Sequence, residues 1–145
     1  MIAPAEPPSV PWRRHALWAC LAALYALCIF LLSEIPGTRL ARYGFRHALA
    51  NLCHIPLYAG FAALVLMAFA GSLARVRRIA WSTLYTIAAV MTYAVTDELH
   101  QRFVPGRFAS PGDLALDFLG ATIALGGMHL AARRVAGRAS DVPER

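Results

Sequence analysis

Four long apolar runs divide the chain, and short segments rich in Arg, Gly and Pro separate them. Each run has about the 20 residues that a helix needs to cross a lipid bilayer. The pattern predicts transmembrane helices over residues 15–33, 48–70, 79–101 and 111–132. Because the connections are too short for a separate soluble domain, we predict an all-α fold, an integral membrane four-helix bundle over residues 15–133.

Polar or Pro-rich segments flank the bundle. Residues 1–14 contain four prolines, which disfavour a regular helix, and we expect a flexible tail there. Residues 134–145 are polar and are expected to form a second tail. The first apolar run is longer than the apolar region of a signal peptide, and no small-x-small cleavage site follows it. We therefore expect this run to remain as a helix.

Composition supports lipid as the solvent of the bundle, since 59% of the residues are hydrophobic and 15% are charged. The formal net charge of +6 could indicate a nucleic-acid ligand. The basic residues, however, are all arginine and lie in short clusters between apolar runs, where positive charge orients membrane helices. No nucleic-acid partner is therefore expected. The three cysteines have no repeated spacing, which favours neither disulfides nor a zinc motif.

The distribution of arginine predicts the orientation, because cytoplasmic connections collect the excess of positive charge. Nine arginines lie in the two tails and in the 71–78 turn, which share one side of a four-span protein. The other two connections carry five, and the three in the first connection weigh against the assignment. We predict that both termini, and so both tails, are cytoplasmic.

This topology brings polar residues from three separate segments to one depth near the outer leaflet. The segments are the start of the second run, the end of the third and the start of the fourth. They contribute Asn51, His54, Tyr58, Asp97, Glu98, His100, Gln101, Asp113 and Asp117. Ionisable side chains at membrane depth require partners and mark candidate functional sites.

Helical spacing indicates which of these side chains share a face, because residues four apart lie on the same side of a helix. The pairs with this spacing are His54 and Tyr58, Asp97 and Gln101, and Asp113 and Asp117. Each helix can thus present one polar stripe to a common centre. Glu98 lies about 100° from Asp97 around the helix and is expected to face elsewhere. Arg102 and Arg107 offer positive charge to the carboxylates or to an anionic ligand.

Several of these residues also have a purely structural interpretation. Ser110 and Asp113 fit the N-cap serine and the acid of a capping box. His54 could bond to carbonyls that Pro56 leaves free, and His100 could be an interfacial histidine without a role. A structural salt-bridge network could join the charged residues Asp97, Glu98, Arg102 and Arg107.

A longer stretch resembles a known family. Residues 96–107 read Thr-Asp-Glu-Leu-His-Gln-Arg-Phe-Val-Pro-Gly-Arg and are followed by Ser110, Asp113 and Gly120. They are similar to the hallmark of the VanZ-like family, which has Asp-Glu-x-x-Gln at a helix end, a Phe-x-Pro-Gly-Arg loop and an aspartate that opens the last helix. The resemblance implies a multi-pass protein of the bacterial cytoplasmic (inner) membrane.

Two further motifs extend the resemblance over residues 32–127. The first helix ends in the family's Ser-x-x-Pro at Ser33, and the second carries its His-x-x-x-Tyr-x-Gly from His54. The chain departs from the pattern at Asn51, where the family usually has lysine, and at Asp117, where it usually has asparagine. The cluster therefore has one cation fewer and one carboxylate more than the pattern. The family's namesake lowers susceptibility to the glycopeptide teicoplanin, but the resemblance supplies neither a reaction nor a cofactor.

Three functions remain open at this point. In the first, the outer cluster of a cell-envelope protein binds the head group of a membrane lipid, a lipid-linked cell-wall precursor or a lipoglycopeptide, with a link to glycopeptide susceptibility. The ligand-binding candidates are His54, Tyr58, Asp97, Glu98, Gln101, Arg102, Arg107, Asp113 and Asp117. We favour binding, because the cluster has charged and hydrogen-bonding groups but no complete catalytic constellation.

The second function is an intramembrane hydrolase or transferase that acts on a lipid. Its candidate catalytic residues, as a general base or as ligands of a divalent metal, are His54, Asp97, Glu98, His100 and Asp113. The spacing assigns no metal site, because Glu98 and His100 point to different sides of a helix. The third function is structural, with an assembly role. Small residues would then allow close helix approach, namely Ala22, Ala23, Gly60, Gly120, Gly126 and Gly127.

Overall fold

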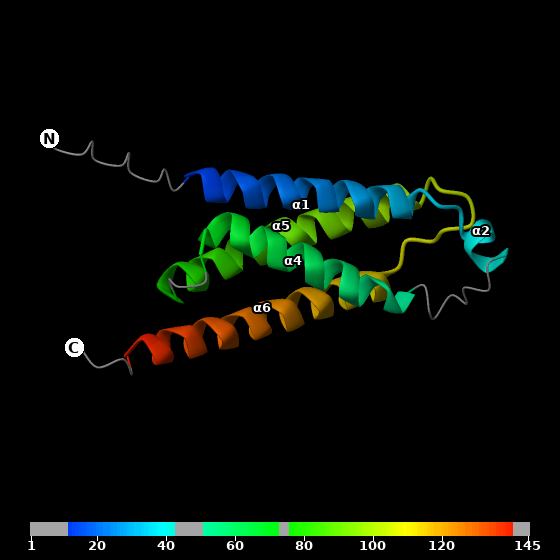
Figure 1. Cartoon of the computed structure of the whole chain (residues 1–145). Coiled ribbons are helices and arrows are strands. Elements are labelled where there is room, and N and C mark those ends of the chain that lie inside the picture. The colour runs from blue at the N-terminus through cyan, green and yellow to red at the C-terminus, as the bar shows by residue number, and fades with distance from the viewer. Residues whose placement is uncertain (1–11, 43–50, 73–75, 141–145) are drawn as a thin grey trace, which may run out of the picture.

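The structure, a computed structural model, describes residues 12–42, 51–72 and 76–140. Within them lie the helices α1 (Trp12–Ser33), α2 (Gly37–Arg42), α4 (His54–Ala70), α5 (Val76–Gln101) and α6 (Pro111–Ser140), shown in Figure 1. These described residues contain no β-strand. The predicted all-α fold is therefore confirmed.

The four long helices correspond to the four apolar runs, but four of their boundaries differ. α1 begins at Trp12 rather than at residue 15, so residues 12–14 are helical and not part of a flexible tail. α5 begins at Val76 rather than at residue 79, inside the predicted turn. α4 begins at His54, after a turn at Cys53, rather than at residue 48. Residues 48–50 lie outside the described part. α6 continues to Ser140 rather than ending at 132, because the Ala- and Arg-rich sequence beyond 132 favours helix and contains no proline before Pro143. The short helix α2 occupies the predicted first connection.

α4 lies at the centre of the bundle and packs against α1, α5 and α6. The backbones of α1 and α5 come close at few points, and side chains bridge the two helices. α1 begins and α6 ends at the same end of the bundle (Figure 1). At the opposite end α1 and α5 finish while α4 and α6 start. This opposite end carries the predicted polar positions.

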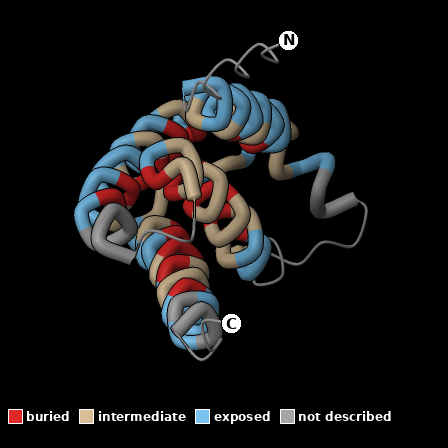
Figure 2. The backbone as a smooth tube through the Cα atoms, turned by 60° about the vertical axis from the view of Figure 1, so that its left-hand side comes forward, coloured by how far each residue is buried: buried red, intermediate tan, exposed pale blue. Residues whose placement is uncertain are grey.

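The outer surface of the bundle is apolar. Figure 2 shows exposed faces along the outside of α1, α5 and α6 and buried residues on their inner sides. Exposed large hydrophobics include Leu24, Leu31, Trp81, Leu84 and Ile123. α1 and residues Pro111–Val135 of α6 are each long and apolar enough to cross a membrane, and α4 is a shorter apolar helix. An apolar exterior around buried polar groups is typical of a protein surrounded by lipid.

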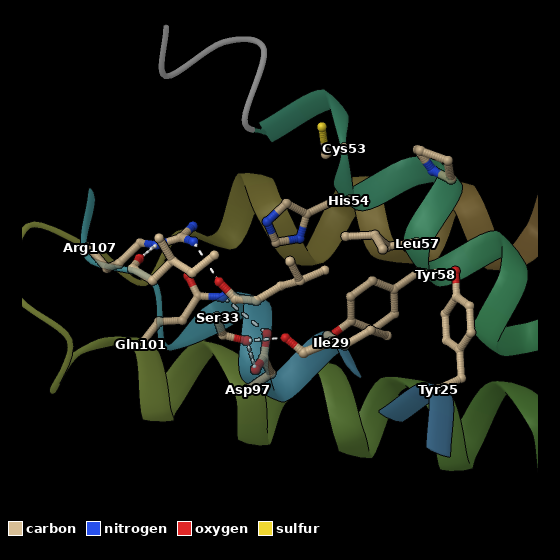
Figure 3. Close-up of a pocket in the computed structure, with 13 residues that line it drawn as sticks. Tyr25, Ile29, Ser33, Cys53, His54, Leu57, Tyr58, Asp97, Gln101 and Arg107 are labelled. Carbon is tan, nitrogen blue, oxygen red and sulfur yellow. Dashed lines mark hydrogen bonds between the residues drawn. The ribbon is translucent and has the colours of Figure 1, made fainter. Parts of the chain in front are cut away.

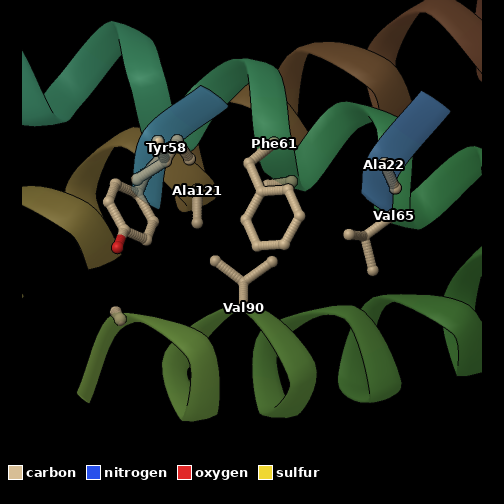
Figure 4. Packing of buried hydrophobic residues seen from close by; sticks show 9 residues of the cluster. Ala22, Tyr58, Phe61, Val65, Val90 and Ala121 are labelled. Carbon is tan, nitrogen blue, oxygen red and sulfur yellow. The ribbon is translucent and has the colours of Figure 1, made fainter. Parts of the chain in front are cut away.

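The apolar core forms where side chains of α4 meet the other three long helices. Phe61 and Val65 of α4 lie against Val90 of α5 and Ala22 of α1 (Figure 4). Tyr58 extends this cluster towards the polar end of the bundle. The core therefore fixes α4, and with it His54 at the start of α4, relative to the other helices.

Two glycines allow close helix approach, in agreement with their predicted role. A Cβ built on Gly120 would lie 2.3 Å from the carbonyl oxygen of Ile55, so α6 crosses α4 nearly backbone to backbone. A Cβ on Gly60 would lie 2.6 Å from the hydroxyl oxygen of Tyr25. Among the described residues, a Cβ on Gly126 or Gly127 meets nothing within 4 Å, so neither glycine mediates a close approach there.

We expect Gly120→Ala to lower the free energy of unfolding by about 1–3 kcal/mol, because a methyl group cannot enter the contact without separating α4 from α6. Gly126→Ala is the matched control in the same helix and should not destabilise the protein. Thermal unfolding of both variants in detergent, followed by circular dichroism, checks this prediction. Equal loss of stability in both variants would contradict the close α4–α6 contact.

Candidate functional site

Most of the buried polar side chains gather at the end of the bundle where α4 and α6 start. Seven of them come from four helices: Ser33 of α1, His54 of α4, Asp97, Glu98 and Gln101 of α5, and Asp113 and Asp117 of α6. Each is at most 9% exposed. The polar stripes predicted for the second, third and fourth runs therefore do converge, and α1 joins them.

A pocket of about 420 Å³ opens beside this cluster, between the end of α1 and the start of α4 (Figure 3). The side chains with polar groups in its lining are Tyr25, Ser33, His54, Tyr58, Asp97, Gln101 and Arg107. Its apolar lining includes the exposed residues Leu32, Cys53 and Pro56. The pocket thus combines a polar floor with an apolar rim.

A chain of hydrogen bonds forms the floor of the pocket. The Oγ of Ser33 lies 2.5 Å from Oδ1 of Asp97, and the side-chain amide of Gln101 donates to Oδ2 of Asp97 over 3.0 Å. Ser33 Oγ also lies 2.9 Å from the carbonyl oxygen of Ile29. A hydroxyl carries one proton. Ser33 therefore donates to only one of these two oxygens at a time.

Arg107 reaches the pocket from a tight turn after α5. Gly106 has φ 75°, follows Pro105, and the N–H of Arg107 donates to the carbonyl of Val104. Proline followed by a glycine with positive φ is the signature of a type II turn. Gly37 at the start of α2 donates its N–H to the carbonyl of Pro105, which ties this turn to α2.

The guanidinium of Arg107 donates to the carbonyl oxygens of Ile35 and Leu32, at 3.1 and 3.2 Å. It thereby satisfies carbonyl groups at the C-terminal end of α1, where a positive charge is favourable. Burial lowers the pKa of Arg107 from its ordinary value, while the nearby carboxyl groups of Asp97 and Glu98 oppose that shift. An arginine remains protonated under these conditions.

Behind the pocket, His54 and Asp117 form a buried pair. The Nδ1 atom of His54 lies 2.8 Å from Oδ1 of Asp117, which is fully buried. The prediction that His54 bonds to carbonyls freed by Pro56 is therefore replaced by a side-chain partner on α6. The ring of His54 also stacks parallel to the ring of Tyr58, at 6.2 Å between centroids.

The start of α6 has a capping arrangement that differs from the predicted capping box. The N–H of Gly112 donates to Oγ of Ser110 over 3.1 Å, which confirms Ser110 as the N-cap. In a capping box the N–H of Ser110 would bond to Asp113. It donates instead to Oε2 of Glu98 over 2.9 Å. Glu98 therefore faces the cluster, contrary to expectation, and the carboxyl group of Asp113 is released from the cap.

Four buried oxygen atoms in this region have no hydrogen-bond partner within the described structure. They are the hydroxyl of Tyr58, Oε1 of Glu98, Oδ1 of Asp113 and Oδ2 of Asp117. Buried polar groups are nearly always hydrogen-bonded, and an unpaired one is costly. The cluster therefore has unused capacity for a ligand, a proton or a cation.

The remaining candidates lie outside the buried cluster. His100 contacts the carboxylate of Glu34 and lies beside Phe30, on the partly exposed side of α5. Arg102 is exposed and does not line the pocket. Asn51 is half-buried one turn before α4. The predicted salt-bridge network is wrong for Arg107, which bonds to carbonyls; the ion pairs among the described residues are His54–Asp117 and His100–Glu34.

Reasoning from the polar stripes missed the contribution of α1. Ser33 and Glu34 bond to α5, and the carbonyl groups of Leu32 and Ile35 hold Arg107. A four-span topology requires the first helix to end on the side of the membrane where the second begins. It could therefore have predicted that Ser33 and Glu34 lie beside the cluster. Ser33 also stands in the Ser-x-x-Pro motif on which the family resemblance rests.

The arrangement can bind hydroxyl, amide and anionic groups through Tyr58, Asp97, Gln101 and the N–H groups of Arg107 that the carbonyls leave free. The His54–Asp117 pair can also accept a proton from a bound water or hydroxyl. The Ser33 hydroxyl, however, pairs with Asp97 rather than with His54. The pocket therefore has the parts of a polar binding site and a candidate base.

One of three comparisons with known proteins identifies a family. A family model described as VanZ/LLP1 matches residues 17–132, which include α4 and α5, most of α1 and α6, and the pocket. The chain belongs to the VanZ/LLP1 family. Searches of curated proteins and of solved structures gave no match. For this VanZ-like membrane protein, the sequence comparison shows the family and the structure locates the candidate site.

We expect Ser33→Ala to lower the free energy of unfolding by about 1–2 kcal/mol, because Asp97 loses a buried hydrogen-bond partner. Thr96→Ala is the matched control, since the exposed Thr96 hydroxyl donates only to the carbonyl of Thr92 in its own helix. Its effect should stay within about 0.5 kcal/mol. Denaturant unfolding in detergent measures both values, and a silent Ser33→Ala would contradict the role of α1 in the cluster.

Proposed function

We propose that this VanZ-like protein spans the bacterial cytoplasmic membrane four times, with both termini cytoplasmic, and that its pocket binds the polar head group of a lipid at the outer leaflet. The observation that carries the proposal is the pocket between α1 and α4, with its polar floor and apolar rim. A lipid has the same division into a polar head and apolar chains.

The size of the pocket supports a head group rather than a whole lipid. A volume of about 420 Å³ falls in the lower part of the range of small-molecule sites. The acyl chains would then lie outside, along exposed apolar residues such as Leu31 and Leu32 at the end of α1. Contact between lipid acyl chains and these apolar side chains carries no free-energy cost in a bilayer.

The floor of the pocket favours a head group with both hydroxyl and anionic groups. The hydroxyl of Tyr58 has no hydrogen-bond partner among the described residues and points towards the Ser33–Asp97 pair (Figure 3). It can bond to a ligand without first breaking a bond in the protein. Asp97 and Gln101 complement hydroxyl or amide groups, and Arg107 complements a phosphate or carboxylate. Arg102 is exposed and would contact a ligand only from outside the pocket.

The same chemistry extends to lipid-linked cell-wall precursors and to lipoglycopeptides, since both join sugar or peptide groups to an apolar chain. Binding of either molecule at the outer leaflet would connect the protein to glycopeptide susceptibility. The pocket accommodates only part of such a large molecule, so we place the contact at one sugar, amide or phosphate group.

A lipid hydrolase or transferase is a second candidate, and one observation favours it. His54 lines the pocket and is held by the buried Asp117, as a general base would be. Turnover would change the bound lipid, whereas binding alone leaves it intact. Mass analysis of phosphatidylglycerol recovered after incubation with the protein separates the two functions.

We expect both loops next to the pocket to face the cell exterior. In a chain whose cysteines are replaced by serine, Arg102→Cys should react with a membrane-impermeant maleimide on intact cells. Arg134→Cys, near the end of α6, should react only after permeabilisation. The reverse pattern would place the termini outside, and labelling of both variants in intact cells would contradict four spans.

We expect Tyr58→Phe to weaken binding of phosphatidylglycerol, which carries a phosphate and two hydroxyls, by about 3–10-fold. This factor corresponds to the loss of one hydrogen bond of about 0.5–1.5 kcal/mol. The stability of this variant should stay equal or rise, because the unpartnered buried hydroxyl is removed. Native mass spectrometry of lipid titrations in mild detergent measures the binding.

Tyr93→Phe is the matched control for this change. The Tyr93 hydroxyl donates to the carbonyl of Ala26 and does not line the pocket. This variant should lose about 1 kcal/mol of stability and keep its lipid affinity. Phosphatidylcholine, which has no free hydroxyl, should bind more weakly than phosphatidylglycerol to the wild type. If Tyr58→Phe loses stability and keeps its affinity, the cluster is structural and the binding function fails.

A further inference from the structure

We infer that His54, Glu98 and Asp117 form a binding site for one divalent transition-metal cation, with Asp113 beside them. The site lies behind the wall of the pocket, and the inference does not rest on the proposed lipid binding. The spacing of candidate ligands along the sequence gave no such site. The structure assembles it from three helices.

The first argument is the convergence of ligand atoms. One donor atom from each of His54, Glu98 and Asp117 lies within 4.8 Å of the other two. Some point then lies within about 2.8 Å of all three atoms, compared with bonds of about 2.0–2.2 Å from Zn²⁺ to imidazole nitrogen and carboxylate oxygen. Closing that difference requires the side chains to move by well under the length of one bond.

The second argument is that the ligand groups are buried and incompletely bonded. Glu98 is 3% exposed and Asp117 is fully buried, yet Oε1 of Glu98 and Oδ2 of Asp117 have no hydrogen-bond partner in the described structure. Asp113 is 6% exposed and its Oδ1 is likewise unpartnered. It interacts electrostatically with both Glu98 and Asp117. A single bound cation could be coordinated by these unpartnered oxygen atoms.

The third argument is charge. The three carboxyl groups face one imidazole, and the guanidinium of Arg107 is held by the carbonyl groups of Leu32 and Ile35. Carboxylates removed from water require compensating charge or protons. A divalent cation compensates two of the three charges and bonds to their free oxygens in one step.

The donor set indicates the class of cation. One imidazole with two or three carboxylates suits Zn²⁺ or Mn²⁺, whereas Mg²⁺ retains several waters and is seldom held by imidazole. The local structure also prepares the ligands. The N–H of Ser110 fixes one oxygen of Glu98, and the four-residue spacing of Asp113 and Asp117 places both on one face of α6.

The test uses full-length protein without a histidine tag, stripped with a chelator, incubated with excess Zn²⁺ and desalted. Elemental analysis should find about one Zn²⁺ per chain in the wild type, and Glu98→Gln and Asp117→Asn should each bind about tenfold more weakly or worse. Both variants can keep their existing hydrogen bonds, because an amide oxygen still accepts from Ser110 or His54. Glu34→Gln is the matched control and should bind Zn²⁺ like the wild type.

Co²⁺ provides a second readout that does not need the variants to fold. Visible absorption of the Co²⁺-loaded wild type should show coordination by nitrogen and oxygen, without the thiolate charge-transfer band that binding through Cys53 would give. The proposal is overturned if the wild type retains no stoichiometric metal, if the thiolate band appears, or if folded Glu98→Gln and Asp117→Asn bind Zn²⁺ like the wild type. The carboxyl groups would then be compensated by protons.

Discussion

The burial of four carboxyl groups at one end of an apolar bundle is the constraint on which the other features of the site depend. Asp97, Glu98, Asp113 and Asp117 are each at most 6% exposed. Removing a carboxylate from water costs several kcal/mol, and lipid around the helices supplies no polar partner. The partners must therefore come from the protein. They come from helix ends: Ser33 is the last residue of α1, His54 is the first of α4, and the backbone N–H of Ser110 precedes α6.

The loop between α5 and α6 joins the framework to the site. Gly106 adopts positive φ, the resulting turn contacts the start of α2, and Arg107 caps carbonyl groups at the end of α1 while lining the pocket. One side chain thus stabilises a helix end and offers charge to a ligand. A structural interpretation and a binding interpretation of Arg107 are therefore compatible, and loss of binding in an Arg107 variant alone would not separate them. The unpartnered Tyr58 hydroxyl separates them better, because it has no bond to lose within the described structure.

Much of this arrangement could be predicted from sequence, because periodicity determines which residues share a helix face. The four-residue spacing of Asp113 and Asp117 placed both correctly in the cluster. Glu98 was expected to face elsewhere because it lies about 100° from Asp97. The angle was right, but α5 has neighbours on both sides: Asp97 contacts α1, and Glu98 approaches α4 and α6. The diversion of the Ser110 N–H from Asp113 to Glu98 depends on how the helices pack, which no local pattern encodes.

His54 connects the pocket to the acidic group formed by Glu98, Asp113 and Asp117. Its ring lines the pocket, and its Nδ1 atom contacts Asp117. Asp117 gives this connection an ionisable partner. In a medium of low dielectric, a proton or cation added to the acidic group changes the potential in the pocket strongly. An anionic head group and that positive charge would strengthen each other's binding by the same factor, as linkage requires. A neutral head group would gain little affinity from that positive charge. The pocket and the acidic group would therefore influence each other mainly when the ligand is charged.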